Sequence, residues 1–432
     1  MESKSITYLE KIITLVVGNA GAQILLIFST FFFARIYDEV AFGYLGYLTA
    51  FTGIISVVLS GRFENVYLRV RFERIRSSLI FIPLVSCLLI GLIGGVCFIY
   101  ARRFFPLDGY VDLPIAAFLI ASFLTVLFKF FTQHLISKNQ FSAAANAKLV
   151  QAITIILGQL IFYKSEFGLI YGVILGLMTS VLMMFFTLKI RRFLPLKIIY
   201  LYVKKFKNFP IYEMPSAFVN ALSANFNIFL IGIFFSVSSV GYFALAYRIV
   251  MLPASLFGVS IGQAFFSEIT KDDSDYAVLV FNTALKATLF IAGPAIGLIF
   301  FAQPVFEVLL GSDWQVTGQI VCIIAPTLIT NFAISPLSYV FSAKDLQRLD
   351  FLMMLLLVFL RGIGFLVPAY YLGFLEAILG YSLMSTLFFV IYGTVAFYLA
   401  NVRGAFKYSI LVVPSVIAWA MFFFGPSIEF VK

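Results

Sequence analysis

Charge is scarce in this chain of 432 residues: only 12% of the residues are Asp, Glu, Lys or Arg, whereas 62% are hydrophobic. A soluble domain of this size would leave too much of that apolar surface in contact with water. The apolar residues instead fall in blocks of about 18–25, each long enough for a helix to cross a bilayer core. The strict alternation of a membrane barrel is missing. The sequence therefore predicts an all-α polytopic membrane protein, because helices satisfy their own backbone hydrogen bonds in lipid.

Cysteine and histidine are also scarce, with three cysteines and one histidine in the whole chain. Cys87, Cys97 and Cys322 lie in apolar blocks without metal-ligand spacing, and His134 adds no cluster. No phosphate loop and no nucleophile–base pair is visible, which argues against ATP-driven transport within this chain and against an enzyme. We expect no cofactor. We also expect no nucleic-acid partner, because the net charge of +10 lies in short loops between the blocks.

The apolar blocks predict about twelve spans in two halves of six. They cover residues 12–34, 42–60, 78–100, 112–133, 149–163 and 167–189, then 213–235, 241–266, 280–303, 319–341, 351–372 and 374–399. The first block is too long for a cleavable signal peptide and is expected to be a span. A further apolar stretch, 408–425, is either a thirteenth span or an interfacial hairpin. The predicted organisation is a six-helix bundle over 1–190, a basic cytoplasmic connector over 191–209, a second bundle over 210–400, and a tail over 401–432.

Lysine and arginine are distributed unequally over the predicted loops. If the N-terminus is cytoplasmic, the outer loops hold only Arg35, Arg102, Arg103 and Lys164, with Lys432 in the tail, and the inner loops hold most of the others. The rule that positive charge stays inside therefore predicts a cytoplasmic N-terminus. The basic segment 189–207 is also suited to lie on anionic lipid headgroups, or it is a topology signal and nothing more.

A short internal repeat relates the two halves. Residues 42–48 (Phe-Gly-Tyr-Leu-Gly-Tyr-Leu) match residues 240–246 (Val-Gly-Tyr-Phe-Ala-Leu-Ala), and each stretch opens the second span of its half. Because both halves start inside, the repeats are parallel and are expected to be related by a pseudo-twofold axis along the membrane normal. Two such bundles predict a central cavity with alternating access.

Four basic residues lie inside predicted spans: Lys129, Arg248, Lys286 and Arg361. A basic residue at the bilayer centre costs about 2.5–3.5 kcal/mol on insertion scales. Such a set indicates a wet, electropositive lumen and an anionic ligand, although snorkelling to the interface also explains Lys286. Glu213 and Glu376 lie near span starts, where a first-turn acid that complements the helix dipole is an equally simple explanation.

Polar side chains at helical spacing accompany these charges. Gln133 follows Lys129 by one turn, Asn220 follows Glu213 by two turns, and Asn331 lies on the tenth span. These residues are candidates for binding substrate, whereas helix–helix packing is the alternative for each alone. Arg62 and Glu64, at the inner end of the second span, form a candidate gate pair or are ordinary loop charges.

Several motifs resemble those of the oligosaccharide flippases of polysaccharide biosynthesis. They are Phe33-Ala34-Arg35-Ile36-Tyr37, Phe42-Gly43-Tyr44, Gly61-Arg62-Phe63-Glu64-Asn65, Phe209-Pro210-Ile211-Tyr212-Glu213-Met214-Pro215-Ser216-Ala217, Asn220-Ala221-Leu222-Ser223, Gly241-Tyr242-Phe243-Ala244-Leu245-Ala246-Tyr247-Arg248, Leu252-Pro253-Ala254-Ser255, Gly262-Gln263-Ala264-Phe265-Phe266 and Gly311-Ser312-Asp313-Trp314. The resemblance covers most of residues 10–400.

This resemblance implies membership of the multidrug/oligosaccharidyl-lipid/polysaccharide superfamily, with two six-helix bundles. It implies that a polyprenyl-diphosphate-linked oligosaccharide is flipped from the cytoplasmic to the periplasmic leaflet of the bacterial inner membrane, for O-antigen, capsule or exopolysaccharide synthesis. The expected partners are the lipid-linked oligosaccharide, membrane lipids, and a glycan polymerase with its chain-length proteins.

The residues and the resemblance lead to the same hypothesis. Cations in a wet lumen replace the hydration of a diphosphate, and arginine holds phosphate through two parallel hydrogen bonds. Net direction requires consumption of the substrate outside or coupling to H⁺ or Na⁺, for which Glu213 is the candidate acid. The alternatives are a cation-coupled multidrug exporter of the same superfamily and a non-transporting scaffold for glycan synthesis.

Overall fold

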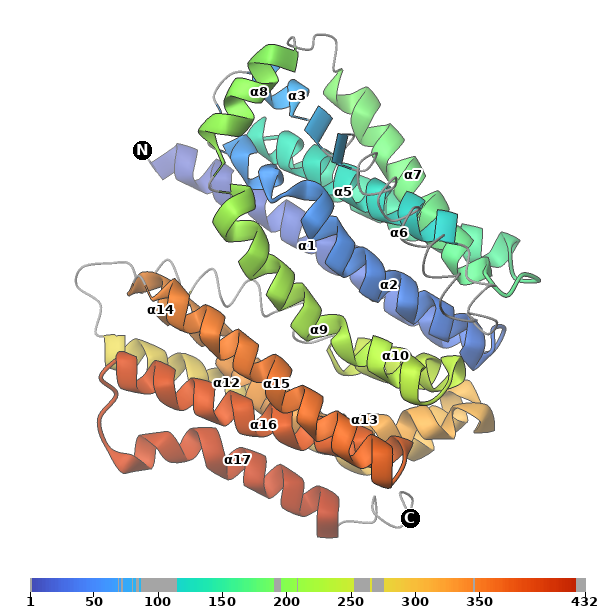
Figure 1. Ribbon diagram of the computed structural model, residues 1–432, viewed down its shortest axis with the longest axis vertical. Helices are drawn as coiled ribbons and strands as arrows, with labels where there is room; N and C mark the ends of the chain where they lie inside the picture. Colours follow the sequence, from blue (N-terminus) through green and yellow to red (C-terminus); the bar gives the residue numbers. More distant parts are fainter. Residues whose placement is uncertain are drawn as a thin grey trace, which may run out of the picture. The chain divides into compact units, whose positions relative to one another are not determined.

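A computed structural model describes residues 2–68, 70, 73–79, 81–82, 85–86, 115–189, 196–207, 209–251, 265, 276–344 and 346–424. Within these ranges the regular structure is helical and contains no strand. Figure 1 labels the helices. They are α1 (Glu2–Phe33), α2 (Glu39–Ser60), η1 (Phe63–Leu68), α3 (Glu73–Ser78), α5 (Ile115–Ser137), α6 (Phe141–Ile161), α7 (Gly168–Leu188), α8 (Leu196–Lys205), η2 (Phe209–Glu213), α9 (Met214–Phe234), α10 (Val237–Val250), α12 (Tyr276–Leu310), η4 (Ser312–Trp314), α13 (Gln315–Ile334), η5 (Ser335–Leu337), α14 (Ser338–Ala343), α15 (Gln347–Tyr371), α16 (Phe374–Leu399) and α17 (Ala405–Phe424).

Ten helical segments of the described chain are long and apolar enough to cross a membrane. Two shorter apolar helices, Val17–Phe33 and Val237–Val250, accompany them. The prediction of an all-α polytopic membrane protein is therefore confirmed. Most of the predicted third span lies outside the described residues, and so does nearly all of the second half of the eighth span.

Two helices differ from the limits that hydropathy suggests. α6 begins at Phe141, eight residues before the predicted span, because the stretch after Phe141 is rich in alanine and so favours helix although it carries Ser142, Asn146 and Lys148. α17 is one helix that passes through Pro414, and its part from Lys407 to Phe424 is long and apolar enough to span. The structure thus agrees with a thirteenth span and not with a hairpin at 408–425.

The described chain divides into two compact units. Unit 1 contains Met1–Tyr37 and Tyr44–Asn225, and unit 2 contains Asp38–Gly43 and Phe226–Lys432. The limits predicted for the two bundles, the connector and the tail stay predictions. The first residues of α2 belong to unit 2, whereas the remainder of that helix belongs to unit 1.

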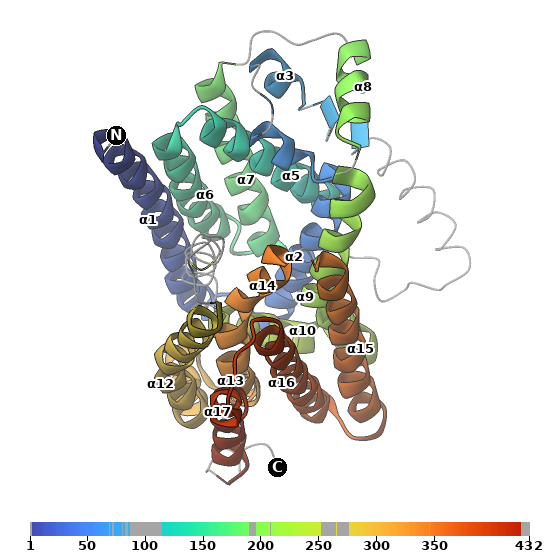
Figure 2. The ribbon, with the colours of Figure 1, turned by 90° about the vertical axis from the view of Figure 1, so that its left-hand side faces the viewer.

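Small residues bring the helices of unit 1 together. A Cβ added to Gly172 of α7 would lie 2.8 Å from the backbone nitrogen of Gln159 in α6, and one added to Gly176 would lie 2.8 Å from the carbonyl oxygen of Gln151. Close backbone approach of this kind is typical of helices that associate in lipid. At one end of the unit the Tyr37 hydroxyl donates to the Gln159 carbonyl at 2.6 Å, and burial raises the pKa of Tyr37 to about 12. The helices α1, α5, α6 and α7 pack side by side in unit 1 (Figure 2).

Buried hydroxyl groups join the helices of unit 2. The Thr327 hydroxyl of α13 lies 2.6 Å from the Ser382 hydroxyl and 2.9 Å from the Thr386 hydroxyl, both on α16. The Trp419 indole of α17 donates to the Thr386 hydroxyl at 3.2 Å. Polar contacts between buried helices satisfy groups that lipid cannot satisfy. Thr327 therefore serves the packing of α13 against α16.

The two equivalent glycines of the internal repeat, Gly43 and Gly241, meet in unit 2. A Cβ on Gly241 of α10 would overlap the Glu39 carbonyl and would lie 3.0 Å from the Gly43 nitrogen. A Cβ on Gly43 would overlap the Val237 carbonyl. Trp314 packs edge-on against Phe42 and Tyr242, with ring centroids 5.0 and 5.9 Å apart. The first turns of α2 and α10 thus cross in backbone contact, and the Trp314 ring packs against a residue of each helix.

Candidate functional site

A charged cluster lies in unit 1 at the end of α2, where the chain turns into η1. Gly61 and Arg62 are both left-handed, with φ of 52° and 60°, a conformation that is uncommon for arginine. An Arg62 Nη1 lies 3.6 Å from Glu64 Oε1, and Glu64 is only 5% exposed. Neither Glu64 Oε2 nor Arg62 Nε has a hydrogen-bond partner among the described residues. Arg62 and Glu64, predicted as a gate pair or as ordinary loop charges, therefore form an ion pair with unused hydrogen-bonding groups.

Lys129 of α5 joins the same cluster. Its amine donates to the Ser56 hydroxyl of α2 at 2.8 Å, and the charges of Glu64 and Arg62 are close enough to act on it. A half-buried ammonium with a neutral hydroxyl partner keeps most of its capacity to bind an anion.

Glu213, the last residue of η2, is connected to this cluster by a hydrogen bond with Asn65. The Asn65 amide donates to Glu213 Oε2 at 3.2 Å, and Asn65 directly follows Glu64. The cluster thus holds two cations, Arg62 and Lys129, and two acids, Glu64 and Glu213. Sequence reasoning had assigned these four residues to three separate roles, namely substrate binding, gating and coupling.

The two predicted amides of unit 1 have more open positions. Gln133 is half-buried on α5 and Asn220 is exposed on α9. No hydrogen bond to either side chain is found within the described part of the chain. Both groups are available to a ligand with hydroxyl groups.

Arg361 of α15 is enclosed in unit 2. It is 6% exposed, and its Nε donates to the Ser385 hydroxyl of α16 at 2.9 Å. The guanidinium lies over two aromatic rings, 5.0 Å from the centroid of Tyr381 and 5.9 Å from that of Phe389. Planar stacking on aromatic faces stabilises a guanidinium that has left water.

The other predicted residues of unit 2 lie apart from one another. Arg248 is half-buried in the last turn of α10, with no hydrogen bond or ion pair to a described residue. Lys286 is exposed on α12. The Asn331 amide approaches the Met251 sulfur at 3.6 Å, which is a weak contact. Of the two arginines predicted for this unit's site, Arg248 is therefore less enclosed than Arg361.

Three of the residues that complete these contacts were not predicted. Asn65 and Ser56 hold Glu213 and Lys129, and Ser385 holds Arg361. Asn65 stands in the motif Gly61–Asn65, which was the available signal. Ser56 and Ser385 had no signal in the sequence, because a serine in an apolar helix usually serves packing.

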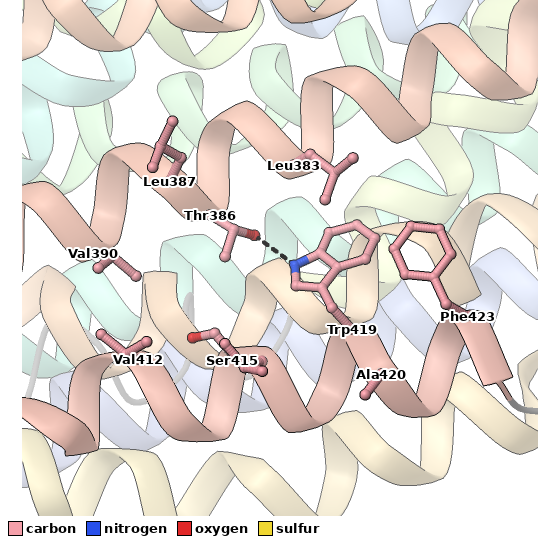
Figure 3. Close-up of a pocket in the computed structure, with 10 residues that line it drawn as sticks. Leu383, Thr386, Leu387, Val390, Val412, Ser415, Trp419, Ala420 and Phe423 are labelled. Carbon is pink, nitrogen blue, oxygen red and sulfur yellow. Dashed lines mark hydrogen bonds between the residues drawn. The ribbon is translucent and has the colours of Figure 1, made fainter.

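An apolar groove of about 490 Å³ lies between α16 and α17 (Figure 3). Its lining includes Leu387, Val390, Val416 and Phe423, and the polar groups at its wall are the Ser415 hydroxyl and the bonded pair Thr386–Trp419. Such a lining suits hydrocarbon and not a charged headgroup.

Replacing Trp419 with phenylalanine is expected to loosen α17. The change removes the hydrogen bond to Thr386, which contributes about 1 kcal/mol, and leaves part of the indole site empty. Hydrogen exchange of the α17 peptide should become faster. The control is Phe424→Leu, since Phe424 is 91% exposed and its replacement should change nothing. Unchanged exchange in the Trp419 variant would contradict this role.

Comparison with known proteins identifies the family of this chain. The model of a family described as "polysaccharide biosynthesis protein" matches residues 32–319, which is more than half of the chain. The chain belongs to this family. A curated relative, the teichuronic acid biosynthesis protein TuaB of Bacillus subtilis (strain 168), is 26% identical over 152 residues, which are 34% of this chain. The matched part spans about a third of that relative's length, 32%.

Solved structures show the same fold. A lipid II flippase in an inward closed conformation has a TM-score of 0.67 at 18% identity, over 97% of this chain and 100% of its own. A multidrug resistance MATE transporter of the MOP superfamily, inward-facing, has a TM-score of 0.62 at 16% identity, over 91% and 96%. A MOP superfamily transporter from Pyrococcus furiosus, described by a reverse polarity of its binding pocket, has a TM-score of 0.58 at 14% identity, over 93% and 96%. This member of the polysaccharide biosynthesis family therefore has the fold of flippases and multidrug transporters.

Proposed function

We propose that this protein flips a polyprenyl-diphosphate-linked oligosaccharide from the cytoplasmic to the periplasmic leaflet of the bacterial inner membrane, with its N-terminus in the cytoplasm. One observation carries the proposal: a chain of the polysaccharide biosynthesis family, with the fold of known transporters, has cations within its apolar helices. Lys129 has a neutral partner, and Arg248 has none among the described residues. A diphosphate is the anion that a lipid carrier of sugars brings with it.

The diphosphate headgroup requires cations on its path. It crosses the hydrocarbon region only if protein groups replace the water molecules that hydrate it. Arg248, Arg361 and Lys129 are the proposed phosphate-binding residues, and Lys286 assists at an exposed position on α12. The guanidinium of Arg248 is the first contact, since Arg361 is covered in the described conformation. Asn220, Gln133 and Asn331 are the proposed partners of sugar hydroxyls.

Direction requires a second process. Either the translocated unit is consumed outside by a glycan polymerase with its chain-length proteins, or transport is coupled to H⁺ or Na⁺. Glu213 is the proposed coupling acid, and Arg62 with Glu64 is the proposed gate, because all three belong to one charged cluster around η1. The prenyl chain stays in hydrocarbon during transport, where apolar surfaces such as the groove between α16 and α17 are suited to it.

A cation-coupled multidrug exporter is the alternative, because MATE transporters have this fold. Exporters of cationic drugs need acids in the lumen, and the intramembrane charges here are mostly basic. The reverse polarity described for the Pyrococcus furiosus transporter indicates that pocket charge differs within the superfamily. A non-transporting scaffold for glycan synthesis is a third hypothesis. It does not explain why cations lie within the apolar helices.

Deletion of the gene tests the proposal. We expect a lipid-linked oligosaccharide to accumulate at the cytoplasmic leaflet while surface polysaccharide disappears. The accumulated lipid, analysed by mass spectrometry, also identifies the glycan. Unchanged surface glycan together with new sensitivity to cationic drugs would favour the exporter instead.

The Arg248→Ala variant should fail to restore export in the deletion strain. Loss of a desolvated cation that binds phosphate costs about 2–5 kcal/mol of binding free energy, enough to reduce export at least tenfold. Arg403→Ala, which removes an exposed arginine of the loop before α17, is the matched control and should restore export fully. Full export by an Arg248→Ala protein that is present at normal level would reject the cationic lumen.

A further inference from the structure

We propose that α8 and the turn that follows it form a binding site for the anionic surface of a lipid bilayer. This inference is independent of the transported substrate. It rests on the two faces of α8, on the charge of the surrounding segment, and on the position of α8 in unit 1.

The inward face of α8 is held by the core of unit 1. Tyr202, Val203 and Phe206 pack against a cluster that contains Phe63, Tyr67 and Phe130. The rings of Tyr202 and Phe206 are stacked with centroids 6.4 Å apart, and Phe209 continues the row at 6.2 Å from Phe206. These contacts fix the rotation of the helix about its own axis, and they determine which side chains face outward.

The outward face combines lysines with large apolar side chains. Lys204, Lys205 and Lys207 are exposed, as are Tyr200 (65%) and Leu201 (57%) one turn earlier. In η2, the next helical segment after α8, Ile211 and Tyr212 are 51% and 70% exposed. Apolar side chains beside lysines are the pattern of a helix that lies in the headgroup region, where tyrosine is also enriched.

The charge of the segment selects an anionic surface. Between Glu166 and Glu213 the chain contains no Asp or Glu, whereas it contains seven lysines and arginines, which are Lys189, Arg191, Arg192, Lys197, Lys204, Lys205 and Lys207. Free phosphate would satisfy the lysines alone and would leave the apolar side chains in water. A bilayer with anionic headgroups satisfies both kinds of side chain.

The position of α8 fits a membrane surface. Both views place α8 at the same end of unit 1 as α3 (Figures 1 and 2). Arg76 of α3 donates there to the Ser137 carbonyl, at the last residue of α5, so this end of unit 1 is where a spanning helix stops.

Hydrogen exchange of the purified full chain tests the site. The protein is placed in nanodiscs of phosphatidylcholine alone, or of phosphatidylcholine with phosphatidylglycerol, and exchange of the peptide 196–207 is measured. Each lysine at an anionic surface contributes about a fivefold factor, so three lysines predict exchange about 100-fold slower in the anionic discs. The variant Lys204→Gln/Lys205→Gln/Lys207→Gln should lose this difference between the two lipids.

The control variant is Lys344→Gln/Arg348→Gln/Arg403→Gln, which removes three exposed cations outside the segment 189–207 and should keep the wild-type difference. Peptides of α5 and α6 report whether each variant is folded. A second variant, Tyr200→Ser/Leu201→Ser, keeps all the charge and should lose part of the protection. Equal exchange of wild-type α8 in both lipids, as expected if a protein partner covers it, overturns the proposal. Lipid dependence that persists in the triple lysine variant overturns it too. Transport is not measured, so the result does not depend on the proposed function.

Discussion

Replacing Gly241 with alanine is expected to destabilise the folded protein by about 3 kcal/mol or more. The new Cβ would overlap the Glu39 carbonyl and would lie 2.8 Å from the Glu39 carbonyl carbon. These are backbone atoms, so that no side-chain rotation relieves the contact, and the first turns of α2 and α10 must separate. Overpacking of this kind usually costs about 1–3 kcal/mol where side chains can adjust. Thermal unfolding in detergent and the monodisperse fraction after purification measure the loss.

The chain offers a matched control for this variant. Gly293 of α12 is also a helical glycine, but a Cβ added there meets nothing within 4 Å. Gly293→Ala should leave stability unchanged or raise it slightly, since alanine favours helix over glycine by about 1 kcal/mol. Gly43→Ala should resemble Gly241→Ala, because its Cβ would overlap Val237. Equal stability of the Gly241 and Gly293 variants would disprove the crossing of α2 and α10.

Replacing Arg361 with methionine is expected to abolish export while the protein stays folded. Buried charges are often replaced by apolar side chains of similar volume without loss of stability. Ser385 keeps a partner when the arginine is removed, because its hydroxyl also donates to the Tyr381 carbonyl at 2.7 Å. The guanidinium, which lies over the rings of Tyr381 and Phe389, is lost together with any phosphate that it binds. Glycan export in the deletion strain and the unfolding midpoint are measured on the same variant.

Two further substitutions separate charge from packing. Arg361→Ala leaves a cavity between α15 and α16 and should lower stability by about 2–5 kcal/mol, so its loss of export alone is not informative. Arg361→Lys keeps the charge without the planar fork of donors and should export poorly if phosphate is bound through two parallel bonds. Normal export by the methionine variant would remove Arg361 from the proposed lumen.

For the candidate site, the sequence predicts which charged residues lie in apolar helices, but not what surrounds them. Lys129, Arg248 and Arg361 were found from the sequence because a charge in a long apolar block is costly wherever it lies. Their surroundings were not. Arg361 is enclosed by Ser385 and two rings, whereas Arg248 is half-buried and has no partner among the described residues. Exposure depends on neighbouring helices, which hydropathy does not describe.

The sequence by itself determined the class of the protein, the approximate extent of most spanning helices and the identity of its intramembrane charges. Each of these depends on local composition and on the energy of transfer to lipid. Only the tertiary structure decided that Arg62, Glu64, Lys129 and Glu213 form one cluster, and that Gly43 meets Gly241. Apart from the Arg62–Glu64 pair, these contacts join residues far apart in the chain. They follow from the close packing of particular helix faces, which cannot be inferred from the residue pattern along a single helix.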